Sequence, residues 1–199
     1  MRLGRPTPDD VARLAERLAP RPLNHDAGLL DRIDDEPRLP RHPGGWFVDH
    51  HRVIIGTGDG DFARATDAFR RMVQFDREWI VLPDEPAPIE EGAVIAYAGR
   101  VLGTWWGYGC RILRVVDEPT RFGFVYGTIV GHPVRGEERF LLEHRPDDSV
   151  VYSLVAMSRP GRWFSWPAMP VARRVQRRFR SASAAAMLQE MGAAPDGSD

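Results

Sequence analysis

The stretch FGFVYGTIVGHPVRGEERFLLEHR, residues 122–145, decides the fold of this chain. Two strand-like runs, 122–129 and 137–145, flank a turn at Gly131-His132-Pro133, which is the pattern of an antiparallel hairpin. Similar runs, separated by turn residues, extend the pattern on both sides and predict a meander of about six strands; they cover about 92–99, 104–116 and 150–158. A shorter strand at 52–56 and a helix opening at Asp59 or Asp61 precede the meander.

A long helix is predicted after the meander, from about Pro167 to Met191. Its apolar stripe consists of Ala168, Val171, Ala172, Val175, Phe179, Ala182 and Ala186. Strands in a run, bracketed by helices, indicate an α+β fold: a curled antiparallel sheet of about seven strands wrapped on this helix. A cavity between the two is where a small hydrophobic ligand would bind.

The N-terminal part is predicted to be a helix followed by an irregular segment, and not part of the strand meander. Thr7 caps a helix that Pro8 opens, and a stretch rich in proline, glycine and charge follows from Asn24 to Gly45. We therefore expect a helix and irregular arm over 1–45, one domain over 46–191, and a disordered tail over 192–199.

Composition excludes several classes of protein. The net charge of −1 does not favour a nucleic-acid partner, and no apolar run approaches the length of a membrane span. All 27 basic residues are arginine, which removes Schiff-base chemistry. A lone cysteine, Cys110, fits a reducing compartment, so we expect a cytoplasmic protein.

No cofactor or metal is expected. The segment IIGTGDGDF (54–62) resembles a dinucleotide fingerprint, but Asp59 and Asp61 would place negative charge where a pyrophosphate must bind. His50 and His51 are adjacent on a strand, so their side chains point to opposite faces and do not converge on a metal.

Alternation along 137–145 predicts a candidate site. Glu138 shares the inward face with Phe140 and Leu142, and His132 lies at the turn near the same opening. Tyr126 and Thr128 are expected around this mouth, with Arg111, or Arg114 after a one-residue slip, as partner of Glu138. The outward face is predicted to hold Glu137, Arg139, Glu143 and Arg145. Such a group suits acid–base chemistry, but a hairpin with a buried salt bridge fits the same pattern.

Aromatic residues supply the remaining candidates. In GTWWGYGC (103–110), Trp106 and Tyr108 are interrupted by glycines, which indicates either a pocket wall or a bent strand around the last helix. Phe179 would face the same cavity from that helix. Arg173, Arg177 and Arg180 are placed opposite the apolar stripe, as a solvated face.

These residues carry a resemblance to the DUF1990 domain family, from about Gly45 to the last helix. Its motifs are WWxxxCRI at Trp105–Ile112, FGFxYGTxxGHPxxGEExF at Phe122–Phe140 and SRP at Ser158–Pro160. The family is similar to the START and pollen-allergen superfamily, which implies a helix-grip fold. The motif positions that the resemblance marks are Tyr126, Gly127, Thr128, Gly131, His132, Pro133, Gly136, Glu137 and Glu138.

Three functions are compatible with these observations. The first is binding of a small hydrophobic molecule by Trp106, Tyr108, Arg111, Tyr126, Thr128 and Phe179. The alternative is a cofactor-free enzyme, such as a cyclase or aromatase, an isomerase or a hydrolase, in which His132 and Glu138 act as acid and base. The third is a partner-binding module that uses the arm and the arginine face. The arm could also form a lid, the contact of a homodimer, or nothing more than packing.

Overall fold

The computed structural model describes residues 3–32, 41–42, 45–75, 78–161 and 169–192. Within this part, eight strands form one antiparallel sheet in the order β1-β2-β8-β7-β6-β5-β4-β3. The strands are β1 (Arg41–His42), β2 (Trp46–Thr57), β3 (Ile80–Val81), β4 (Val94–Val101), β5 (Thr104–Glu118), β6 (Arg121–Thr128), β7 (Val134–His144) and β8 (Ser149–Pro160). The helices are α1 (Pro8–Leu18), α2 (Gly58–Arg70), α3 (Met169–Met191) and the short 3-10 helix Leu30–Arg32.

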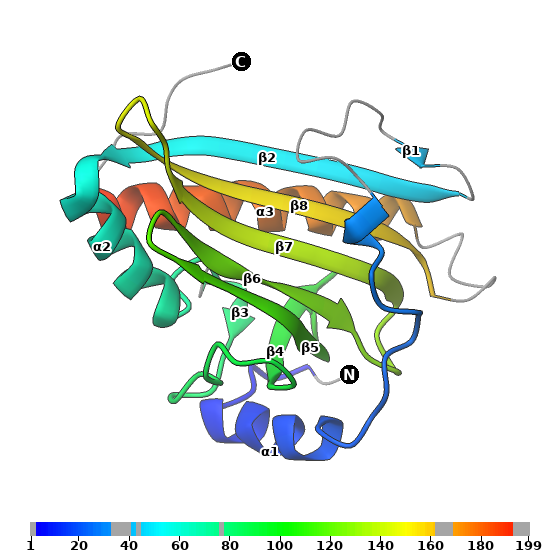
Figure 1. Ribbon diagram of the computed structural model, residues 1–199. Coiled ribbons are helices and arrows are strands. Elements are labelled where there is room, and N and C mark those ends of the chain that lie inside the picture. The colour runs from blue at the N-terminus through cyan, green and yellow to red at the C-terminus, as the bar shows by residue number, and fades with distance from the viewer. Residues whose placement is uncertain (1–2, 33–40, 43–44, 76–77, 162–168, 193–199) are drawn as a thin grey trace.

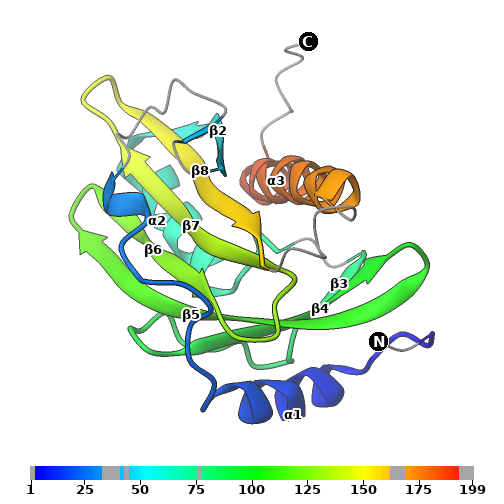
Figure 2. The same cartoon turned by 90° about the vertical axis from the view of Figure 1, so that its right-hand side faces the viewer.

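The sheet curls around α3, which crosses its concave side (Figures 1 and 2). Strands β4 to β8 follow one another as hairpins, and β2 joins the far edge by pairing with β8 from Phe47↔Ser158 to Thr57↔Ser149. This long pairing makes β2 longer than the predicted strand at 52–56. The α+β architecture predicted from the meander and the last helix is confirmed.

The concave side has a filled end and an open end. At the filled end, α2 and the second half of α3 bury the aromatic residues Phe69, Phe124 and Tyr152 against the sheet. Here the predicted stripe of α3 is displaced, because Ser183, Ala184 and Met187 are buried while Ala182 and Ala186 are half-buried. The first half of α3 is only half-buried and covers the other end. Ala168 lies outside the described residues.

Helix α1 packs on the convex side, beneath β4 and β5 (Figure 2). Its N-terminus has the predicted capping box, in which Thr7 and Asp10 bond to each other's backbone N–H. A Cβ at Gly107 would lie 2.5 Å from a methyl group of Leu14, and one at Gly109 would lie 2.7 Å from Leu18. These glycines therefore let α1 approach the strand closely. The two interpretations of GTWWGYGC, a pocket wall or a bent strand around the last helix, did not include this contact.

Residues 22–31, which we call the N-terminal strap, continue from α1 across the outer faces of β6 and β7 (Figures 1 and 2). Leu23 forms an isolated bridge with Ile129, and Leu29 and Leu30 pack into an outer apolar cluster. The sheet contributes Val48, Val125, Val155 and Met157 to that cluster. The sheet is thus covered on both faces, which explains why every residue from Ser149 to Ser158 is buried.

No helix among the described residues is long and apolar enough to cross a membrane. Of the predicted tail, 193–199 lies outside the described residues, as do 33–40 and 43–44 of the predicted arm.

Candidate functional site

A cavity of about 450 Å³ lies between the concave face of the sheet and the first half of α3. This volume is in the range of pockets that hold small organic molecules. Most of the wall is apolar or aromatic, and its aromatic residues are Trp79, Tyr97, Trp106, Tyr108, Tyr126, His132 and Phe179. From α3, the apolar residues Val171, Ala172, Val175 and Phe179 of the first half line this cavity.

Glu138 lies in the cavity wall, on the inward face of β7 as alternation predicts. Its carboxylate accepts a hydrogen bond from the hydroxyl of Tyr126, the residue directly opposite on β6. Burial raises the pKa of Glu138 to about 7, although the Tyr126 hydrogen bond and the charge of Arg180 act in the opposite direction. Near neutral pH this carboxyl therefore exists in both protonation states.

The cation near Glu138 comes from α3. Arg180 is 8% exposed and pairs with Asp49 of β2 at 3.1 Å, while Arg173 forms two hydrogen bonds to the same carboxylate. The prediction of a solvated face is therefore wrong for Arg180 and for the half-buried Arg173. Helical periodicity alone could not show that β2 would present a carboxylate to this side of the helix.

His132 lies in the turn between β6 and β7 and lines the cavity. Its Nδ1 is 3.0 Å from the carbonyl oxygen of Val134, and its ring lies 5.2 Å from that of Tyr108. Burial lowers the pKa of His132 to about 4, so the imidazole is neutral at physiological pH.

Trp106, Tyr108 and Phe179 all line the cavity, where the sequence places them. Trp106 is 41% exposed, and its indole N–H donates to the hydroxyl of Thr104 at 2.8 Å. The adjacent Trp105 points to the other face and packs with α1 residues.

Thr128 lines the cavity wall, but its hydroxyl group forms hydrogen bonds within the protein. Its Oγ1 donates to Asn24 Oδ1 at 2.7 Å and accepts from the backbone N–H of Gly136 at 3.0 Å. We therefore assign it a structural bond to the strap, and its hydroxyl hydrogen is not free for a ligand.

Arg111 does not reach Glu138, contrary to prediction. Its guanidinium lies on the convex side and donates to the carbonyl oxygens of Ala19 and Arg21 at 2.7 and 3.0 Å, just beyond α1. A bulge between Ile112 and Arg114 then shifts the alternation, and Arg114 also lies outside, where it pairs with Asp31 at 3.0 Å. Because the bulge inserts one extra residue into β5, strict alternation of side chains in either register predicts the wrong side for one of the two arginines.

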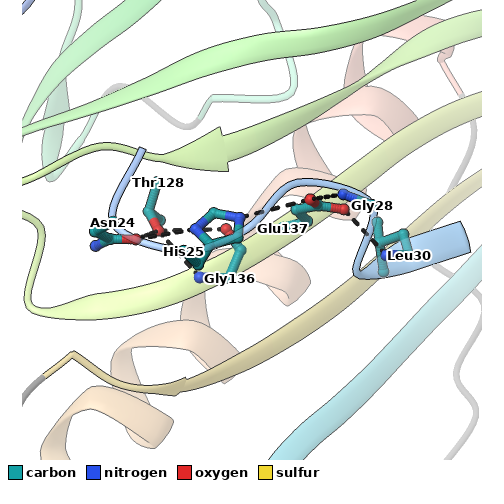
Figure 3. Close-up of polar contacts among 7 residues, drawn as sticks. All are labelled: Asn24, His25, Gly28, Leu30, Thr128, Gly136 and Glu137. Carbon is teal, nitrogen blue, oxygen red and sulfur yellow. Dashed lines mark hydrogen bonds and ion pairs between the residues drawn. The ribbon is translucent and has the colours of Figure 1, made fainter. Parts of the chain in front are cut away.

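Glu137 was expected on a solvent face, but it is 3% exposed beneath the strap (Figure 3). Its two oxygens accept from the backbone N–H groups of Gly28 and Leu30 at 2.7 and 3.0 Å, and His25 Nε2 lies at 3.5 Å. Burial by itself would raise the pKa of Glu137, but these hydrogen bonds outweigh it and the pKa is lowered.

The motif GEE therefore has two separate roles in the structure. Glu137 holds the strap on the convex side, while Glu138 faces the cavity on the concave side. Within the described residues, no group of three or more His, Cys, Asp or Glu side chains converges as a metal site would.

A curled sheet that encloses a cavity against one long helix defines the class of helix-grip proteins. Residues 34–186 match the family described as domain of unknown function (DUF1990), and the chain belongs to this family. A UPF0548 protein of Deinococcus radiodurans is 37% identical over 187 residues, which cover 87% of this chain and 89% of the relative. A UPF0548 protein of Dictyostelium discoideum is 31% identical over 157 residues, 73% of each chain.

Among solved structures, the Zhui aromatase/cyclase from a Streptomyces species superposes with a TM-score of 0.53. The two sequences are 15% identical, and the match covers 74% of this chain and 94% of that one. This similarity confirms the helix-grip fold.

Proposed function

We propose that the protein binds a small hydrophobic molecule in the cavity beneath the first half of α3. The observation that carries the proposal is a 450 Å³ space with an aromatic wall and one inward carboxyl, Glu138. The apolar wall would supply affinity by burial, and Glu138 with Tyr126 would orient the polar end of the ligand.

A ligand carried through purification tests this directly. Native mass spectrometry of the fresh protein, followed by denaturing extraction, should detect a discrete small molecule. Ala172→Phe places a ring in the cavity from α3 and should prevent its retention. Ala185→Phe makes the same change on an exposed position of the same helix and serves as the control. Equal retention by both variants would contradict a site in this cavity.

The second candidate is a cofactor-free enzyme on the same scaffold, and the raised pKa of Glu138 favours it. A carboxyl with a pKa of about 7 can give and take a proton at neutral pH, whereas His132, whose pKa is lowered to about 4, is the weaker base of the two in the same wall. An aromatase or cyclase, an isomerase or a hydrolase could use Glu138 and His132 as acid and base. Turnover of an extracted molecule that Glu138→Gln abolishes, with binding retained, would distinguish catalysis from binding alone.

A further inference from the structure

Three features of the polar end of the cavity determine which ligand chemistry it can accept. The first is an unused hydrogen-bond acceptor. Tyr126 donates to Oε2 of Glu138, whereas Oε1 has no hydrogen-bond partner within the described part of the chain. Glu138 is half-buried, and the surface that it leaves uncovered lines the cavity. When Glu138 is ionised, a ligand that reaches this end therefore meets an acceptor that needs a donor.

The second feature is the charge of the surroundings. Arg173 and Arg180 share the single carboxylate of Asp49, and Glu138 supplies the second negative charge near this pair of cations. Arg177 also lies near Arg180, so three guanidinium groups accompany these two carboxylates, but none of the three arginines lines the cavity. The charged side chain that faces the cavity is Glu138, so a ligand carboxylate beside Oε1 would be repelled by the ionised carboxylate of Glu138.

The third feature is the shape of the wall. The rings of His132, Tyr108 and Tyr97 follow one another along the sheet side, with centroid separations of 5.2 and 5.4 Å. Phe179 lines the cavity from the helix side. Rings on both sides of the cavity offer faces and edges to a bound molecule, and aromatic side chains favour such offset and edge contacts with a flat unsaturated body.

We propose that the cavity selects an uncharged, flat, hydroxylated molecule whose hydroxyl group donates a hydrogen bond to Oε1 of Glu138. The inference rests on the proposed function and adds the chemical class of the ligand to it. No bond is made or broken in this recognition, and the hydroxyl keeps its proton.

Four probes with the same two-ring body isolate the polar group: naphthalene, 2-naphthol, 2-methoxynaphthalene and 2-naphthoate. Equilibrium dialysis against the full chain at pH 8, where Glu138 is mostly ionised, measures each affinity. We expect 2-naphthol to bind at least about tenfold more tightly than 2-methoxynaphthalene, because only the former donates to a carboxylate. We expect 2-naphthoate to bind less tightly than 2-naphthol.

Glu138→Gln tests the acceptor itself. In this variant Tyr126 can donate to the amide oxygen, which turns the amide N–H groups toward the cavity. The preference for 2-naphthol should then vanish or reverse in favour of the methoxy probe, while naphthalene binds as before. Glu143→Gln, on the outward face of the same strand β7, is the matched control and should keep the wild-type preference for 2-naphthol.

The outcomes separate the two proposals. Failure of all four probes to bind, with no effect of Ala172→Phe, would overturn the proposed function. Binding of all four without preference would overturn only the inference about the hydroxyl group. Tightest binding of 2-naphthoate would also overturn it, because an anionic group would then be preferred beside Glu138. A circular-dichroism spectrum and melting temperature for each variant exclude misfolding as the cause.

Discussion

Neighbouring residues Glu137 and Glu138 show how one strand gives two identical side chains opposite properties. Hydrogen bonds from the strap lower the pKa of Glu137, whereas burial in the cavity wall raises the pKa of Glu138. Alternation predicts that they face opposite sides, and this is confirmed. It did not predict that the outer side is covered, because the covering residues Gly28 and Leu30 lie more than 100 positions earlier in the chain.

The raised pKa of Glu138 predicts a pH dependence of stability. Because the pKa rises from 4.5 to about 7 on folding, the folded state holds the proton more tightly. Its stabilising contribution is complete below pH 4.5 and is lost as the pH rises through about 7. Glu138→Gln does not titrate and should escape this loss.

The measurement is the free energy of unfolding of wild type and Glu138→Gln at pH 4.5 and pH 8, from denaturant titrations. From pH 4.5 to pH 8, the free energy of unfolding of the variant relative to that of the wild type should increase by up to about 3 kcal/mol. A difference that is independent of pH would show that Glu138 keeps an ordinary pKa. The loss of the Tyr126 hydrogen bond affects the variant at both pH values and does not change this slope.

At the scale of elements, the order and type of the strands could be predicted because hairpins and alternation are local. The bulge in β5 could not be predicted, because it depends on pairing with β6. Because of this bulge, Arg111 and Arg114 both lie on the convex side. The same limit applies to α3. Its periodicity predicted the inward residues of the first half but not the displaced stripe of the second half. Burial of Arg180 requires Asp49 on β2, which no local pattern connects to it.

Pairing between β6 and β7 also explains one glycine of the hairpin. A Cβ at Gly123 would lie 2.1 Å from the backbone oxygen of Phe140, so Gly123→Ala must displace the strand. We expect it to lower the free energy of unfolding by about 1–3 kcal/mol. Gly60→Ala is the control, because Gly60 is exposed in α2 with nothing within 4 Å of its Cβ position. Alanine there should raise stability by up to about 1 kcal/mol. Denaturant titration measures both, and equal stability of the two variants would contradict this account.

For the whole molecule, the strap extends the folded unit beyond the region by which the family is recognised. The family match begins at residue 34, whereas the cover over Glu137, Val125 and Val155 comes from residues before it. A chain beginning at residue 34 would expose this apolar cluster and remove two hydrogen bonds from a buried carboxylate. We expect a lower melting temperature and binding of a hydrophobic dye. An unchanged melting temperature would show that the strap is dispensable.

The two halves of α3 are held by different interactions. Its second half is anchored by buried Met187, Leu188 and Met191, whereas its first half covers the cavity and is tied to β2 through Asp49, Arg173 and Arg180. Moving the first half away from the sheet would break those ion pairs and the ring contacts of Phe179 with Phe75 and Phe140, but would leave the apolar anchor of the second half in place. Under the proposed function, a ligand that enters beneath the first half would therefore meet contacts other than those that anchor the second half. We would then expect substitutions at opposite ends of this one helix to alter ligand exchange and resistance to unfolding separately.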